Sequence, residues 1–222
     1  EWHELMGSKR GVQIELALSR LKTVAPGLRI WGISATIGNM DQALEALLGD
    51  YASKANYRII RADIRKQVDI VSVLPDSLDK MPWTGHLGIH LIEKVIEIVR
   101  QSTSTLIFTN TRSFAEIWYQ RMLDLAPELS GVMAMHHGSI SQELRSWVED
   151  QLHEGKLKAV VCTSSLDLGV DFRPVETVIQ VGGPKGVARF LQRAGRSGHQ
   201  PGAISRIYFV PTHSLELMEA AA

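Results

Sequence analysis

The amino-acid sequence predicts an α/β fold in which helices cover both faces of a parallel β-sheet. Two observations support this prediction. From residue 68 onwards, short apolar segments alternate with segments whose apolar residues recur at helical spacing. Short, apolar strands that alternate with helices are typical of a parallel sheet covered on both faces. Polar clusters follow several of the predicted strands, and this is where such sheets bind ligands.

The first part of the chain contains two predicted helices and one predicted strand. Apolar residues at helical spacing predict a helix over Val12–Val24. A short amphipathic helix is predicted over Asp41–Leu48, and Gly49 is expected to end it, since glycine commonly follows a helix C-terminus. Between the two helices, Leu28–Ser34 predicts a buried strand. With a single strand, this part is too short to form a sheet of its own.

We expect a domain boundary between Gly49 and Val68, and we place it after residue 56. Residues 1–56 then belong to one domain and residues 57–222 form another. The part after the boundary has roughly 150 residues, an ordinary size for a domain. The sequence opens on Glu1 without a methionine, and we expect the chain to be a fragment.

The part after the boundary alternates regularly between strands and helices. The predicted strands are Val68–Leu74, Thr105–Thr109, Gly131–Met135, Leu157–Cys162, Val175–Val181 and Ile204–Val210. The predicted helices are Leu91–Val99, Ser113–Leu125, Ser141–His153 and Lys185–Ala194. Ser139, with Gln142 three residues later, predicts a capping box before the third of these helices.

The composition excludes several classes of protein. Lys plus Arg equals Asp plus Glu, at 24 each, so any nucleic-acid binding must come from a local patch. The single cysteine, Cys162, excludes an internal disulfide and fits a reducing, cytosolic compartment. No signal peptide opens the chain, and no apolar run reaches the roughly 18 residues that a membrane span needs. We therefore expect a cytoplasmic protein.

Four polar clusters follow predicted strands or close a predicted helix. They are Thr109–Arg112, His136–Ser139, Thr163–Asp171 and Gln192–His199. Hydroxyls and backbone amides after a strand can hold phosphates. Arg193 and Arg196, with Gly195 between them, suit bidentate contact with phosphate. Taken singly, these clusters are also compatible with polar helix caps and a solvated basic helix end, so the functional interpretation depends on their order.

Five motifs in order resemble motifs II to VI of superfamily 2 helicases. They are Glu1–His3, Ser34–Thr36, Thr109–Arg112, Thr163–Asp171 and Gln192–His199. The strings EWHEL and GSKRG look like the large-helicase-related (Lhr) family, and TLIFTNTRSFAE, HHGS and TSSLDLGVDFRPVE look like its ligase-associated bacterial branch. The resemblance covers essentially the whole chain. It implies a DEXH-box helicase fragment, with the C-terminal part of a first RecA-like domain in residues 1–56 and a second RecA-like domain in residues 57–222.

The resemblance implies a site for ATP and Mg²⁺ between two RecA-like domains. Glu1 matches the acid that polarises the attacking water. Ser34 and Thr36 match the motif that links the ATP site to nucleic acid, and Gly169 and Asp171 match residues that approach the nucleotide. The phosphate-binding loop GxxxxGK[ST] and the Asp that helps to hold magnesium are not in this sequence, so most of the cofactor site is expected outside it.

The resemblance also implies which residues act on the γ-phosphoryl group of ATP. Arg193 and Arg196 match the arginines of motif VI, and Arg196 is the implied principal arginine finger. Gln192 matches a position that usually touches the phosphates or the first domain. Many relatives carry arginine where this chain has His199, so a second finger is not expected from that position.

A path for nucleic acid is implied along the polar clusters of the second domain. The implied contact residues are Thr109, Asn110, Arg112, His137, Gly138, Ser139, Thr163 and Ser164. Most are neutral donors, which suit sequence-independent contact with a phosphate backbone. His136 and His137 are an alternative pair of metal ligands. Because no Cys, Asp or Glu lies nearby at ligand spacing, no metal site is expected. The run Gly182–Gly186 lacks the order of a phosphate-binding loop and predicts a turn.

The implied function is an ATP-driven, 3′-to-5′ DNA translocase and helicase in the bacterial cytosol, associated with the nucleoid and serving DNA repair beside a DNA ligase and a nuclease. An RNA helicase stays open as an alternative, because backbone contacts discriminate poorly between DNA and RNA. A non-catalytic nucleic-acid-binding module also stays open, since the phosphate-binding loop is missing and the chain alone is expected to lack ATPase activity. A small-molecule α/β enzyme is disfavoured, because no nucleophile–base pair is evident.

Overall fold

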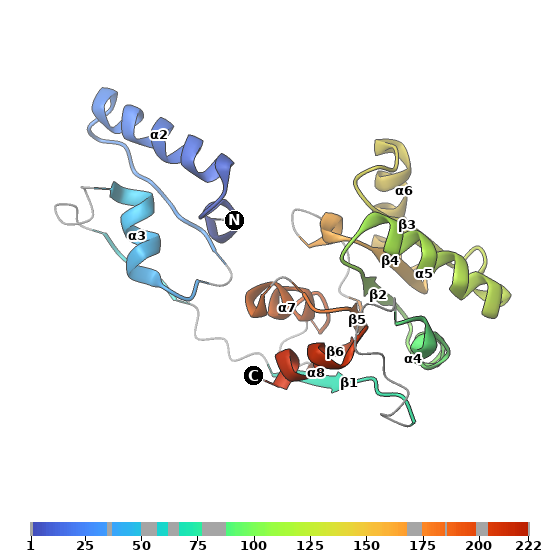
Figure 1. Cartoon of the computed structure of the whole chain (residues 1–222). Coiled ribbons are helices and arrows are strands. Elements are labelled where there is room, and N and C mark those ends of the chain that lie inside the picture. Colours follow the sequence, from blue (N-terminus) through green and yellow to red (C-terminus); the bar gives the residue numbers. More distant parts are fainter. Residues whose placement is uncertain are drawn as a thin grey trace. The chain divides into compact units, whose positions relative to one another are not determined.

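The computed structural model describes residues 2–34, 37–49, 57–61, 67–76, 88–167, 175–184, 186–198 and 204–221 (Figure 1). The chain divides into two compact units, Glu1–Ile64 and Arg65–Ala222. The sequence-based division after residue 56 and the structural division after Ile64 both lie in the interval from Gly49 to Val68.

The first unit is helical. Its helices are α1 (Trp2–Leu5), α2 (Lys9–Val24) and α3 (Met40–Leu48). Ser8 and Asn39 cap α2 and α3, because the side-chain oxygen of each accepts a hydrogen bond from a backbone N–H in the first turn. Trp2 packs with Ala43 and Leu47, and its indole N–H donates to the carbonyl of Ala43 at 3.2 Å. This small cluster joins α1 to α3.

Residues 28–34 do not form a strand, so the prediction of a buried strand is wrong. Trp31 and Ile33 leave 83% and 68% of their surface exposed. A strand needs a neighbour to pair with its N–H and C=O groups, and the described residues of the first unit contain no strand. The carbonyl of Ile33 instead accepts from the backbone N–H of Trp2 at 2.9 Å, which ties the segment to α1.

The second unit is built on a six-stranded parallel sheet with the strand order β1-β6-β5-β2-β4-β3, which confirms the predicted parallel sheet (Figure 1). The strands are β1 (Val68–Ser72), β2 (Thr105–Phe108), β3 (Met133–His136), β4 (Ala159–Cys162), β5 (Thr177–Val181) and β6 (Ser205–Val210). At the centre, Phe108 of β2 pairs with Cys162 of β4 and with Gln180 of β5. β2, β4 and β5 are buried at every position, as expected of parallel strands covered on both faces.

Helices cover both faces of this sheet, which confirms the predicted α/β class. They are α4 (Ile92–Gln101), α5 (Arg112–Leu125), α6 (Gln142–His153) and α7 (Val187–Ala194), and β6 is followed by α8 (Ser214–Ala221). Side chains of α4 and α5 pack with Ile107, whereas side chains of α6 and α7 pack with Leu106 and Phe108. Since successive strand residues point to opposite faces, α4 and α5 cover one face and α6 and α7 the other. No helix in the described part of the chain is long and apolar enough to cross a membrane.

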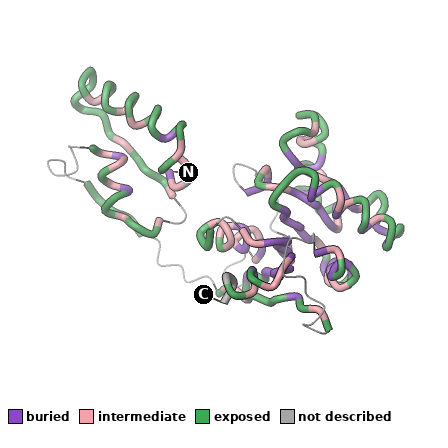
Figure 2. The backbone as a smooth tube through the Cα atoms, in the orientation of Figure 1, coloured by how far each residue is buried: buried purple, intermediate pink, exposed green. Residues whose placement is uncertain are grey.

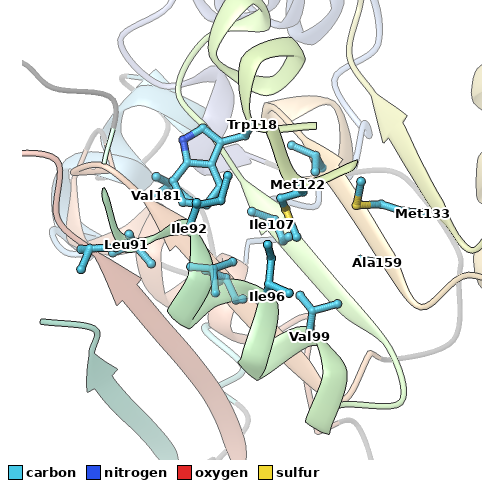
Figure 3. Packing of buried hydrophobic residues seen from close by; sticks show 14 of the residues in the cluster. Leu91, Ile92, Ile96, Val99, Ile107, Trp118, Met122, Met133, Ala159 and Val181 are labelled. Carbon is cyan, nitrogen blue, oxygen red and sulfur yellow. The ribbon is translucent and has the colours of Figure 1, made fainter. Parts of the chain in front are cut away.

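The core under α4 and α5 is the larger of the two clusters in the second unit. Figure 3 shows Trp118 and Met122 of α5 packed over Ile107, with Ile96 of α4 in the same cluster. The ring of Phe114 meets Trp118 edge to face, with the ring centroids 6.3 Å apart. Burial is concentrated in the strands and in the inner faces of the helices (Figure 2). This packing supports the loops that follow the strands.

The predicted capping box at Ser139 is wrong. The cap of α6 is Ser141, whose Oγ accepts from the N–H of Leu144 at 3.3 Å. A turn in which Ile140 donates its N–H to the carbonyl of His137 precedes the helix, so α6 begins later than the capping box requires. The hydroxyl of Ser139 instead accepts a hydrogen bond from Arg112.

Candidate functional site

The polar clusters that follow strands lie at one edge of the sheet. Because all six strands are parallel, their carboxyl ends share that edge, and the loops after β2, β3, β4 and β5 are neighbours. The N–H of Thr109 donates to the carbonyl of Cys162 at 2.8 Å, and the N–H of Thr163 donates to the carbonyl of His136 at 3.2 Å. Backbone hydrogen bonds therefore join the loops after β2, β3 and β4.

Arg112 bridges the loops after β2 and β3. It is the first residue of α5, whose N-cap Thr111 accepts from the N–H of Phe114 at 3.3 Å. Nη1 of Arg112 donates to Oγ of Ser139 at 2.7 Å, and both side chains are exposed. Gly138 is also exposed at this edge. The edge thus presents a cation and a hydroxyl, which are suited to phosphate oxygens.

Two residues predicted to contact nucleic acid are buried in the structure, Thr109 and His137. The hydroxyl of Thr109 donates to backbone carbonyls, among them that of Cys162 at 3.2 Å. Nδ1 of His137 accepts from the N–H of Ser139 at 3.2 Å, and its Nε2 lies 3.4 Å from Oε1 of Glu116. These two side chains hold the loops in shape beneath the exposed positions.

His136 links three elements under the same edge. It ends β3 and is buried, with Nδ1 2.7 Å from Oγ of Ser165 and Nε2 3.1 Å from Oε1 of Glu149 on α6. Burial lowers the pKa of His136; Glu149 opposes the shift, and Arg145 and His137 add to it. Within the described ranges no group of three or more His, Cys, Asp or Glu side chains gathers that would hold a metal ion.

The unfolding free energy of the chain is expected to fall as the pH is lowered from about 7 to about 5, in part because of His136. An unfolded histidine binds a proton with a pKa of about 6.5, whereas the lowered pKa of folded His136 means that it is protonated only at lower pH. Protons therefore favour the unfolded chain in this window. The His136→Gln variant should lose this part of the slope in urea unfolding at a series of pH values. Identical slopes in the two proteins would contradict the assignment.

Arg193 is held in a buried ion pair, with 2% of its surface exposed. Its Nε and Nη2 donate to the two carboxylate oxygens of Asp167 at 2.7 and 3.0 Å. Its Nη1 donates to Oε1 of Gln180 at 2.6 Å, and its guanidinium carbon lies 4.6 Å from the centroid of the Phe108 ring. A bidentate, stacked guanidinium of this kind has its orientation set by its partners.

Asp167 contacts three arginines, two on α7 and one in the turn after it. Besides its pair with Arg193, its backbone carbonyl accepts from Nη2 of Arg196 at 2.5 Å. Arg189 contributes a longer ion pair, with Nε 3.8 Å from Oδ2 of Asp167. Arg196 and Gln192 are partly exposed. The two arginines predicted to act together are thus linked through one aspartate, and Arg196 is the more exposed of them.

Four predicted site residues lie outside the described residues, namely Glu1, Thr36, Gly169 and Asp171. The same holds for His199. Ser34 is described, and its Oγ lies 2.8 Å from Nδ1 of His3 within the first unit.

Sequence analysis missed three residues that organise the edge, Asp167, Gln180 and Glu216. Gln180 had a signal, since it is a large polar residue between Ile179 and Val181 in a predicted strand. Asp167 lies in the polar run after β4, where Asp171 was chosen for its match to a motif. Glu216 lies in the last helix and belongs to no motif. A charged side chain can be predicted to be buried only when the partner that compensates its charge is known.

Cys162 is fully buried at the end of β4. Burial raises the pKa of its thiol, and the nearby Arg193 offsets this in part. Because the thiolate is the reactive form, Cys162 is expected to be chemically inert in the folded protein.

Residues 89–200, half of the chain, match the family described as the helicase conserved C-terminal domain. The ATP-dependent helicase Lhr-Core of Methanothermobacter thermautotrophicus is 36% identical over 204 residues, which cover 90% of this chain and 24% of that protein. The Lhr helicase/probable uracil glycosylase of Mycolicibacterium smegmatis is 32% identical over 259 residues, covering 100% of this chain and 16% of that protein. The chain therefore spans a quarter or less of the length of these relatives.

Solved structures of helicases are also similar to this chain. The structure of Mycobacterium smegmatis helicase Lhr bound to ssDNA and AMP-PNP has a TM-score of 0.85 and 36% identity, and the match covers 100% of this chain and 29% of that one. The DUF1998 helicase MrfA bound to DNA and AMPPNP has a TM-score of 0.74 at 22% identity, covering 95% of this chain and 30% of that one, and so shares the fold.

The fold and the site together define a class, the RecA-like C-terminal domain of a superfamily 2 helicase. The chain belongs to the helicase conserved C-terminal domain family. Its similarity to the Lhr proteins confirms the resemblance to Lhr helicases that the motifs indicated.

Proposed function

We propose that the chain is part of an ATP-dependent helicase, and that its second unit supplies an arginine finger and a nucleic-acid grip to an ATP site shared with the rest of the protein. The observation that carries this proposal is that Arg196 is hydrogen-bonded to the segment after β4, while exposed Arg112 and Ser139 follow β2 and β3 of the same parallel sheet. The relatives that are named ATP-dependent helicases support it, as does the Lhr structure bound to ssDNA and AMP-PNP.

Arg196 is suited to contact the γ-phosphate of ATP. Arg196 is partly exposed, and a guanidinium carries five N–H donors in a planar fork that matches the geometry of phosphate oxygens. Arg193, whose donors face Asp167 and Gln180, acts instead by orienting the end of α7. A finger of this kind neutralises the charge that develops on the transferring phosphoryl group.

The remaining nucleotide contacts are assigned on the resemblance. They are Glu1, Ser34, Thr36, Gly169, Asp171 and Gln192. On the same resemblance, Mg²⁺ and most of ATP are assigned to the part of the protein that carries the phosphate-binding loop, which this sequence does not contain.

DNA is the proposed track, with 3′-to-5′ movement and a role in DNA repair beside a ligase and a nuclease in the cytosol. These assignments rest on the resemblance to the ligase-associated Lhr branch. The ssDNA in the Lhr structure supports the choice of polymer. An RNA helicase of the same superfamily is the second candidate, because exposed Arg112 and Ser139 would contact the backbone of either polymer.

The 222-residue chain is expected to bind single-stranded DNA of about 16 nucleotides more tightly than RNA of the same sequence. Arg112→Ala should weaken DNA binding roughly three- to tenfold, because it removes one charged donor at the exposed edge. Arg121→Ala, an exposed arginine near the other end of α5, is the matched control and should bind as the wild type. Fluorescence anisotropy at fixed, low salt measures all three, since salt weakens such contacts.

Each outcome of this titration distinguishes between the candidates. Tighter binding to RNA than to DNA would favour the RNA helicase. An equal loss of DNA affinity in Arg112→Ala and Arg121→Ala would contradict the assignment of the nucleic-acid contact to the carboxyl edge of the sheet. Absence of binding to both polymers would overturn the proposed grip.

A further inference from the structure

The backbone N–H and the backbone carbonyl of Gly183 both form hydrogen bonds with side chains at the edge of the sheet. Its N–H donates to Oε1 of Glu216 at 2.6 Å, and its carbonyl accepts from Nδ2 of Asn110 at 2.9 Å. Gly183 follows β5, Asn110 follows β2 and Glu216 lies on α8. Three segments far apart in the sequence therefore meet at the backbone of one residue.

Glu216 is a buried carboxylate, with 8% of its surface exposed, and it accepts three short hydrogen bonds. Besides the N–H of Gly183, the N–H and the hydroxyl of Thr212 donate to its Oε2 at 2.6 and 2.9 Å. Nε2 of His213 lies 3.6 Å from Oε1. An ionised carboxylate is an acceptor on both oxygens, whereas a glutamine amide offers one acceptor oxygen and would turn N–H bonds toward the other donors. This arrangement requires a glutamate.

Gly182 shows how tightly the same loop is packed. Its φ is +76°, in the region that favours glycine. A Cβ at this position would lie 3.1 Å from Nδ2 of Asn110, 3.4 Å from Cγ2 of Thr212 and 3.6 Å from Oε1 of Glu216. A side chain at position 182 would therefore crowd the Asn110 amide and would also strain the backbone.

We propose that Glu216 is a positioning residue of the nucleic-acid grip, and that it acts on Asn110 through the backbone of Gly183. The inference rests on the proposed function, in which exposed Asn110 contacts the nucleic-acid backbone. The Asn110 amide carries two N–H bonds, and its contact with Gly183 uses one. By fixing the Gly183 carbonyl, Glu216 fixes the direction in which the second N–H is offered to a phosphate oxygen. This gives a role to a glycine-containing run whose sequence predicted only a turn.

The test is the binding of a fluorescein-labelled single-stranded DNA by the 222-residue chain. Glu216→Gln should weaken binding about three- to tenfold, the change expected from the loss of one hydrogen bond in the grip. Thr212→Val is the matched control: it removes a donor from the same carboxylate but leaves the Gly183 contact, and it should bind as the wild type. Thermal unfolding followed by circular dichroism checks that both variants fold.

A double-mutant cycle separates positioning from a merely structural role. Because Glu216 acts through Asn110, Glu216→Gln should cost much less affinity in an Asn110→Ala background than in the wild type. Additive losses, or wild-type affinity in folded Glu216→Gln, would overturn the role of Glu216 while leaving the proposed function standing. A wild-type chain that binds neither DNA nor RNA would overturn the proposed grip itself, and the role of Glu216 with it.

Discussion

Replacing Arg196 with alanine is expected to lower nucleic-acid-stimulated ATP hydrolysis by about 10³-fold or more. Arg196 lies in the turn after α7, is partly exposed, and its Nη2 donates a hydrogen bond to the carbonyl of Asp167. An arginine finger acts chiefly on the charge of the transition state, so the KM for ATP should change much less than kcat.

The measurement is steady-state ATP hydrolysis, with and without single-stranded DNA, by a form of the protein extended at its N-terminus to include the phosphate-binding loop. Arg121→Ala, remote from the edge on α5, should retain the wild-type rate. The 222-residue chain alone should show no steady hydrolysis, because its sequence has no GxxxxGK[ST] loop. If Arg196→Ala retained the full DNA-stimulated rate of ATP hydrolysis, the assignment of Arg196 as the arginine finger would be wrong. If only RNA stimulated the wild-type protein, RNA would be the polymer on which it acts.

Arg193→Met should produce the largest loss of stability, about 3–5 kcal/mol in the free energy of unfolding. The substitution removes both hydrogen bonds that Arg193 donates to the buried carboxylate of Asp167, which then keeps only the longer pair with Arg189, and it removes the Arg193 donor from Gln180. A domain has a total stability of about 5–15 kcal/mol. The midpoint of urea unfolding should therefore move to a much lower concentration.

Two comparisons make this urea experiment specific. Arg206→Met removes an exposed arginine that pairs with Asp69 at 3.4 Å, and it should cost less than about 1 kcal/mol. Replacing both partners of the buried pair, Asp167→Leu with Arg193→Met, should recover much of the loss, because no charge then stays buried. A cost for Arg193→Met no larger than that of Arg206→Met would mean that the buried pair does not stabilise the fold.

Most of the second unit was predictable from sequence, because each element carries its own local signal. The stripe of Leu91, Ile92, Val95, Ile96 and Val99 predicted α4, and every one of these side chains is buried. The apolar run of β4 predicted a strand covered on both faces, and all of its residues are buried. Errors arose where a segment depends on distant partners. Residues 28–34 are as apolar as a strand, but the described part of their unit contains no strand to pair with them.

The candidate site was predictable in part. Parallel strands bring their following loops to one edge, so the meeting of the loops after β2, β3 and β4 followed from the order of strands and helices. The order of strands and helices did not predict that Arg193 is buried whereas Arg196, three residues later, is partly exposed. That difference depends on Asp167 and Gln180, which are 26 and 13 residues away from Arg193 in the sequence. Spacing within a motif does not reveal which member is buried.

The burial of Cys162 makes the chain well suited to site-specific labelling. Its thiol is the only one in the sequence, lies buried at the end of β4 and has a raised pKa. A maleimide dye would therefore react with a cysteine introduced at an exposed position and leave the native residue untouched. Pairs of such dyes, one on each unit, would report the distance between the units as nucleotide and nucleic acid bind, without prior removal of the native cysteine.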